Sequence, residues 1–314
     1  MGLLGRLFGR RRSAGPSDEA LPFMTIDEAA ELRAAMTRSF AERGIEVAVH
    51  PGHVVDDSGR QFGLWNVAAA CHQDPAGRSA WPRIVDAHVG RILDSMTARD
   101  PFSELTPQQV RAQAYIRLHD PESLPGLESG AHRDFAPGVV QLLALDLPQA
   151  VVSFNADHID EFGGWDILRP QALANIAALP VEDSDVVPVE GGGSFRILMG
   201  ESMFTASRAL TVPTLAVELG DAPPSSCGWL LAVPHRHLVM WHTIESLDVI
   251  NVVGAMVALA SGQYAENPGS ISPHLFWWDG TAYQQLTQPG EDGEVAIVVS
   301  PEFQAVLEQL AAQK

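Results

Sequence analysis

The sequence predicts a mixed α+β fold in which mostly antiparallel sheets are flanked by helices. Two observations support this class. Capping residues stand before stretches whose apolar residues recur at helical spacing, as at Thr25–Glu28 and Thr106–Gln109. The centre of the chain carries β-rich runs joined by short links, which favour antiparallel neighbours. Apolar residues make up 46% of the 314 residues, which is enough for one large core or two moderate ones.

Start and stop signals place the helices. Thr25 and Glu28 have the form of a capping box, and Gly44 should end the helix that follows them. A second helix follows Pro82, and the Thr106-Pro107 pair starts another. The remaining expected helices are a short one capped by Asn155 and closing at Gly163-Gly164, one with Pro170 in its first turn that ends before Pro180, one from Ser246 to about Ser261, and a last one from Pro301.

Strands are expected where β-branched and apolar residues gather between turn residues. Asp279-Gly280 should form the turn of a hairpin. The run Gly191–Gly193 is interpreted as another hairpin turn, because Arg196 occupies the last glycine position that a phosphate-binding GxGxxG loop requires. The expected strands are Ile45–His50, Ala114–Leu118, Val139–Leu145, Ala150–Asn155, Ser194–Met199, Gly228–Val233, His237–Trp241, His274–Trp278, Tyr283–Leu286 and Glu294–Val299.

Three regions follow from this pattern. Residues 1–20 form a basic and apolar tail, and residues 21–262 form the α+β region, which could split into two subdomains near residues 100–112. Residues 263–314 form a C-terminal hairpin and helix that pack on this region. No run of about 18 apolar residues occurs, so a membrane-spanning helix is not expected.

Charge is divided unevenly along the chain. The formal net charge is −19, although residues 1–16 carry four arginines and no acid. An acidic body repels phosphate, so nucleic acid is not an expected partner. The tail is interpreted either as a disordered segment or as an anchor in weak contact with an anionic membrane. The expected location is the cytoplasm, or the periphery of the inner membrane face. The residues that would make the membrane contact are Leu3, Leu4, Leu7, Phe8, Arg10, Arg11 and Arg12.

Lysine composition excludes several enzyme classes. Lys314, the last residue, is the only lysine. Phosphate-loop NTPases and protein kinases need an internal lysine beside the nucleotide phosphates. Pyridoxal-phosphate enzymes and Schiff-base aldolases need an internal lysine amine. None of these four classes fits the chain, and no cofactor is expected.

Other candidate chemistry is incomplete. Cys71 and Cys227 are expected to be free thiols, because they form no CxxC pair. His235 and His237 are expected on one strand, with His242 nearby, as surface or edge histidines rather than as zinc ligands. No metal site is predicted. The acidic groups around Asp157–Asp166 and Glu182–Asp185 are interpreted as a solvated helix face and a loop, respectively.

Four short motifs resemble those of the YtpQ-like family of bacterial proteins, a domain of unknown function. The resemblance covers roughly residues 25–260, and it implies no activity or ligand. The motifs are Leu64-Trp65-Asn66-Val67, Asp146 with Pro148, Ala172-Leu173-Ala174-Asn175, and Pro234 with Arg236.

Asn175 is the strongest indication of a binding site. It interrupts an apolar helical stretch, and a buried amide must find hydrogen-bond partners. It is interpreted as either a structural bond to a neighbouring loop or a polar group at the edge of a cleft with Trp165, Arg236 and His237. No complete catalytic set is present, so we expect a non-catalytic binding or adaptor module with a protein partner. The alternative is a small-molecule enzyme with a cleft near Asn175 and Arg236.

Overall fold

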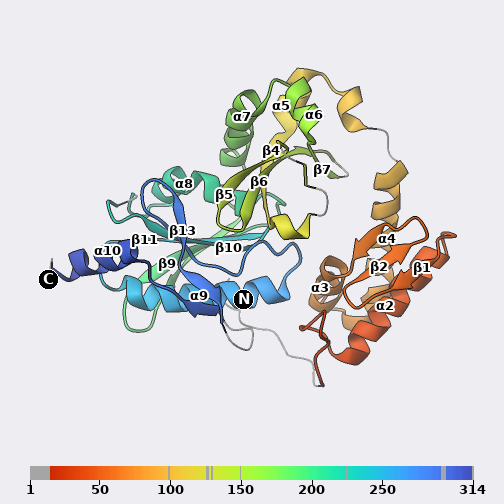
Figure 1. The fold of residues 1–314 in the computed structure, drawn as a ribbon, viewed down its shortest axis with the longest axis horizontal. Coiled ribbons are helices and arrows are strands. Elements are labelled where there is room, and N and C mark those ends of the chain that lie inside the picture. The colour runs from red at the N-terminus through yellow and green to blue at the C-terminus, as the bar shows by residue number, and fades with distance from the viewer. Residues whose placement is uncertain are drawn as a thin grey trace. The chain divides into compact units, whose positions relative to one another are not determined.

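The fold is α+β, as predicted, and Figure 1 shows it in a computed structural model. The structure describes residues 15–97, 100–124, 127–128, 130–148, 150–223, 225–290 and 295–312. The chain divides into two compact units: Met1–Pro101 with Ala265–Gly269, and Phe102–Tyr264 with Ser270–Lys314. The seven tail residues proposed for membrane contact lie outside the described residues. Within the described part of the chain, no helix has the length and apolar character needed to cross a bilayer.

Two helices of the first unit begin at the capping and proline residues that predicted them. The capping box at Thr25 and Glu28 is present, and it starts α2 (Ile26–Ala41). The second predicted helix is α4 (Trp81–Thr97), in which Pro82 occupies the first turn. Helix α3 (Trp65–Gln73) was not predicted, because its alanine-rich stretch has only a weak amphipathic pattern. An antiparallel sheet of β1 (Val47–Val49), β2 (His53–Asp56) and β3 (Gln61–Gly63) completes this unit, together with the 3-10 turn η1 (Gly77–Ala80).

Residues Ala265–Gly269 belong to the first unit although they come late in the chain. The Gln73 amide donates to the Glu266 carbonyl at 2.8 Å and to the Asn267 side-chain oxygen at 3.0 Å. The Gly269 N–H donates to the side-chain oxygen of Asn66 at 2.7 Å. This short segment is therefore held by two polar side chains of α3.

The first sheet of the second unit has the order β4-β6-β5, and β7 also pairs with β6. Its core lies against three helices and includes Ile116, Leu143 and Leu168. Asn155 caps α6 as predicted. The elements are η2 (Pro101–Glu104), α5 (Pro107–Gln113), β4 (Ala114–His119), η3 (Pro121–Ser123), β5 (His132–Ala136), β6 (Val139–Asp146), β7 (Val151–Ser153), α6 (Ala156–Glu161) and α7 (Trp165–Ala177).

A six-stranded antiparallel sheet follows, with the order β13-β12-β10-β11-β9-β8. Gly191–Gly193 form the turn between β8 and β9 as predicted, and all three have positive φ. The elements are β8 (Asp183–Pro188), β9 (Ser194–Met199), η4 (Ala206–Thr211), α8 (Val212–Glu218), β10 (Trp229–His235), β11 (Leu238–Thr243), α9 (Val249–Glu266), β12 (Phe276–Trp278), β13 (Tyr283–Gln285), the pair β14 (Thr287–Pro289) and β15 (Val295–Ile297), and α10 (Pro301–Ala311).

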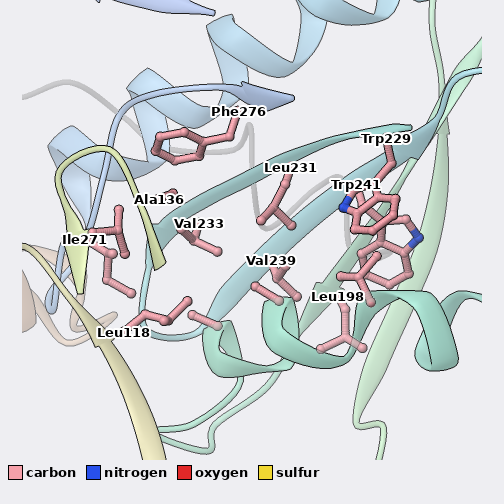
Figure 2. Packing of buried hydrophobic residues seen from close by; sticks show 14 of the residues in the cluster. Leu118, Ala136, Leu198, Trp229, Leu231, Val233, Val239, Trp241, Ile271 and Phe276 are labelled. Atoms are coloured by element: carbon pink, nitrogen blue, oxygen red, sulfur yellow. The ribbon is translucent and has the colours of Figure 1, made fainter. Parts of the chain in front are cut away.

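One apolar cluster joins the two sheets of this unit. Figure 2 shows Val233 of the six-stranded sheet near Ala136 and Leu118 of the other sheet, with Trp241 of the same cluster farther away beside Trp229. Because the sheets share buried side chains, a residue on β4 and a residue on β10 hold fixed positions relative to each other.

Three predictions about elements were wrong. Pro170 is the sixth residue of α7, not part of its first turn, because the helix starts after Gly164. Glu182–Asp185 was expected as a loop, but Asp183 starts β8, an edge strand in which Asp183 is half-buried and Asp185 is exposed. His235 and His237 do not share a strand: His235 ends β10 and is buried, while His237 lies in the turn before β11.

Candidate functional site

Strand β4 carries basic residues on one of its faces. Its side chains alternate between buried and half-buried, with Ile116 and Leu118 in the cores. Alternate residues of a strand point to opposite faces, so Tyr115, Arg117 and His119 share the other face. That face meets the loop after β9, because the Tyr115 ring stacks on Phe204 with centroids 4.4 Å apart.

The β10–β11 turn brings two more basic residues to the same place. Arg236 and His237 are the two residues between the paired His235 and Leu238. The Arg236 carbonyl accepts a hydrogen bond from the Ala206 N–H at 3.0 Å, two residues after Phe204. Arg117, His119, Arg236 and His237 are here called the basic cluster.

The loop at Gly200 fixes the turn. The Gly200 N–H donates to the His237 carbonyl at 3.2 Å, and the Gly200 carbonyl lies 3.0 Å from Nδ1 of His237. Glu182 holds this loop from the other side by accepting the Glu201 N–H at 2.8 Å. A Cβ at Gly200 would lie 2.8 Å from both a Glu182 oxygen and the Thr205 hydroxyl, so a larger residue here would have to displace these side chains.

The two arginines of the cluster lack the usual ion pair. Neither guanidinium pairs with a carboxylate anywhere in the described residues. Burial and the nearby charge of Arg236 lower the pKa of Arg117 to about 10, and burial also lowers the pKa of Arg236. Two partly desolvated like charges raise the free energy of the folded state, unless an anion lies between them.

Both histidines of the cluster are held neutral. Burial, and then the charges of Arg117 and Arg236, lower the pKa of His119 to about 3. Its Nε2 atom is buried and has no hydrogen-bond partner among the described residues. Burial and the Arg236 charge also lower the pKa of His237, although its bonds to Gly200 and Ser202 and the Glu182 charge act in the opposite direction. The positive charge of the cluster therefore comes from its arginines.

The structure separates the four residues predicted from sequence. Arg236 and His237 lie together in the basic cluster. Asn175 instead donates to the carbonyls of Arg111, Ala112 and Ala114 at 3.1, 3.3 and 2.8 Å. These carbonyls lie where α5 ends and β4 begins, so Asn175 has the structural role that the sequence left open. It also fixes the strand that carries Arg117.

Trp165 has a separate position at the start of α7. Its indole N–H donates to the Gly130 carbonyl at 3.0 Å, and the Arg133 guanidinium lies 5.1 Å from its ring centre. Asp166 beside it is exposed and contacts Arg133 at 3.4 Å. The acids of α6, Asp157, Asp160 and Glu161, are exposed as predicted.

No group of three metal-ligating side chains gathers among the residues that are described. His242 is fixed by the Ser194 carbonyl, 2.7 Å from its Nδ1. Cys71 and Cys227 are free, as predicted, and both are buried. Burial raises the pKa of the Cys71 thiol to about 12, so this thiol is not an activated nucleophile.

Sequence reasoning missed Arg117 and His119. The available signal was the alternation in Ala114–His119, where polar residues stand at every second position of an apolar strand. Polar side chains that are partly buried on one face of a strand need polar partners. The sequence does not show that this face of β4 meets the turn at Arg236.

Comparisons with known proteins add no further constraint on function. No family model, curated protein or solved structure matches this chain. The resemblance to the YtpQ-like family therefore stays a prediction from the four sequence motifs.

Proposed function

We propose that this protein is a binding protein, and that the basic cluster binds a small molecule through a carboxylate or phosphate group. The observation that carries the proposal is the pair Arg117 and Arg236, two half-buried guanidiniums without a carboxylate partner in the described chain. An oxyanion between them would replace like-charge repulsion by charge-assisted hydrogen bonds. A guanidinium matches the planar geometry of such groups.

Hydrogen bonding within the cluster leaves Arg236 able to bind. Its Nε–H donates to Nε2 of His237 at 2.9 Å, so that ring fixes the side chain. Its guanidinium makes no other hydrogen bond to a described residue, so its terminal N–H groups remain for a ligand. Arg117 is positioned independently by the pairing of β4 with β6. The two donors are thus held on separate, rigid elements, which lowers the entropy cost of binding.

The acidic body of the protein opposes the approach of an anion but does not prevent binding. Charges on the surface are screened over about 8–10 Å at ordinary salt concentrations. The guanidiniums act at hydrogen-bond distance in a partly desolvated place, where screening is weaker. Local pairing should therefore decide the affinity, and the net charge should mainly slow association.

Thermal unfolding of the full chain tests this proposal. Sodium phosphate and sodium malonate should each raise the melting temperature more than sodium chloride of equal ionic strength. A ligand at about 100 times its Kd adds about 2.7 kcal/mol of stability. The response should be lost in Arg117→Gln and in Arg236→Gln.

Arg133→Gln is the matched control, because it removes the same charge from an exposed arginine of the same unit. It should keep the response to both anions. A loss of the response in this control, or its persistence in both cluster variants, would contradict the proposal.

A small-molecule enzyme is the alternative from another class, and one observation favours it. His119 is neutral, and its Nε2 atom has no partner although it lies near two guanidiniums. Such an imidazole can accept a proton, and the arginines can stabilise negative charge that develops on a substrate. Turnover of a metabolite that His119→Gln abolishes, with phosphate binding retained, would support this alternative over a binding protein.

We also propose, separately, that the N-terminal tail contacts an anionic membrane. Leu3, Leu4, Leu7 and Phe8, followed by arginines, favour weak contact with an anionic membrane. Co-sedimentation with vesicles of anionic lipid should fall as salt rises and should disappear when residues 1–12 are deleted. Equal co-sedimentation of the full and truncated chains would contradict it.

A further inference from the structure

A pocket of the second unit lies between two hairpin tips. It has a volume of about 530 Å³ and is lined by the β5–β6 turn and the β12–β13 turn. This volume falls within the range of small-molecule sites. None of its lining residues belongs to the basic cluster, so it is independent of the proposed anion site.

Three aromatic rings meet in this pocket. The Tyr283 ring lies between Phe135 and Trp278, with centroid distances of 4.9 and 5.0 Å. The ring planes are inclined by 50° and 59°, so they form a concave corner and not a flat surface. All three rings are half-buried, and they pack against the core cluster that joins the sheets.

The corner is rigid before any ligand binds. Trp278 stacks on Trp229 with centroids 5.4 Å apart, and the Trp229 indole N–H donates to the Tyr283 oxygen at 3.2 Å. Asp279 holds the turn by accepting the N–H groups of Thr281 and Ala282 at 2.7 and 2.9 Å. A preformed aromatic corner loses little entropy when a ligand enters.

The charges at the pocket select a cation. Asp134 lines it and is exposed, and its carboxylate has no hydrogen bond or ion pair within the described chain. Among the described residues that line the pocket, none is arginine, lysine or histidine. Aromatic faces attract cations through their quadrupole, and quaternary ammonium groups are bound by several inclined rings. A saccharide would instead need a flat face and several polar partners.

We infer that this pocket binds a small organic cation of the quaternary ammonium class. The rings of Phe135, Trp278 and Tyr283 contact the methyl groups, and Asp134 supplies the compensating charge. The electrostatic attraction between the ring faces and a cation makes the pocket bind a cation more tightly than an uncharged molecule of the same shape.

Tryptophan fluorescence and calorimetry with choline test the inference. Choline should bind saturably, and its neutral isostere, with carbon in place of the ammonium nitrogen, should bind about tenfold more weakly. Equal binding of the isostere would show an apolar pocket and overturn the inference. Binding of a simple glucoside without binding of choline would overturn it in favour of saccharides, and so would the absence of any binding.

Variants locate the binding. Phe135→Leu and Asp134→Asn should each weaken choline binding by about threefold to tenfold. Asp160→Asn removes the same charge from an exposed position on α6 and should leave binding unchanged, as should Arg117→Gln. If the two pocket variants bind choline like the wild type, the inference is wrong. The Arg117→Gln control separates this result from failure of the anion proposal.

Discussion

The Nε–H of Arg236 donates to Nε2 of His237, 2.9 Å away, although both side chains are commonly cationic. Since Nε2 accepts this bond, the proton of the ring must be on Nδ1, where the Gly200 carbonyl lies at 3.0 Å. The hydrogen bond from Arg236 therefore selects one neutral tautomer of His237. Burial, which lowers the pKa of His237, also favours the neutral ring.

We expect His237 to remain a neutral imidazole with the proton on Nδ1 as the pH falls below the ordinary histidine value of 6.5. Nitrogen chemical shifts of the ring, followed by NMR from pH 8 downward to roughly 5, measure this directly. A ring that protonates at the ordinary value would show that the bond from Arg236 does not form in solution.

His119 should make folding stability depend on pH. Its folded-state pKa is about 3, below the ordinary value of 6.5, so the unfolded chain binds the proton between these values. The stability that the lowered pKa of His119 contributes is fully present above pH 6.5 and is lost as the pH falls toward 3. His119→Gln should reduce the slope of unfolding free energy against pH by up to about 1.4 kcal/mol per unit in this window. Burial also lowers the pKa of His88 to about 4, so only the difference between variant and wild type isolates His119. Parallel stability curves for the two proteins would contradict the assignment.

Replacement by glutamine should change the stability of the protein differently at Arg117 and at Arg196. Arg196 donates to both oxygens of Asp221 and to the Leu219 carbonyl, so Arg196→Gln should destabilise the second unit by about 1–3 kcal/mol. Arg117 has no such partner in the described residues. Without added anion, Arg117→Gln should leave the denaturation midpoint unchanged or raise it, because a desolvated charge is removed. A loss of stability as large as that of Arg196→Gln would show that Arg117 already has a stabilising partner.

Asn175→Ala should destabilise the second unit by about 1–3 kcal/mol, because three carbonyls where α5 ends and β4 begins lose their donor. Asn175→Asp should cost at least as much, since a carboxylate cannot donate to carbonyls. The matched control is Gln171→Ala, whose amide only donates to Asn175 from an exposed position at 3.1 Å. Urea denaturation measures all three variants. Equal, small effects for Asn175→Ala and Gln171→Ala would show that the amide is dispensable.

Local signals determined which elements could be predicted. The capping boxes at Thr25 and Thr106 need only four neighbouring residues, and both helices start where expected. Pro170 misled the prediction, because proline in a first turn is the common case. Strand β8 was missed because its acidic residues match a loop, while its pairing with β9 is a property of the folded sheet.

The basic cluster required the same non-local information. Arg236 and His237 were identified in the sequence, but their neighbours Arg117 and His119 lie on a strand far earlier in the chain. The proximity of these two pairs of residues depends on the loop at Gly200 and on the stacking of Tyr115 with Phe204. Asn175 was recognised as unusual, yet its three acceptors are backbone carbonyls, which no side-chain pattern reveals.

The late segment Ala265–Gly269 has a consequence for the order of synthesis. Asn66 and Gln73 are made early, but the residues that they bind emerge only after most of the second unit has been translated. On the ribosome, the first unit must therefore wait without these partners, and water must solvate the two polar side chains of α3 until then. A fragment that stops at Pro101 would remain in that incomplete state. The chain also passes between the units three times, at 101–102, 264–265 and 269–270. A single cut at 264–265 or 269–270 leaves the units joined through the 101–102 bond, whereas a cut at 101–102 leaves residues 1–101 held only by non-covalent contacts such as those with 265–269.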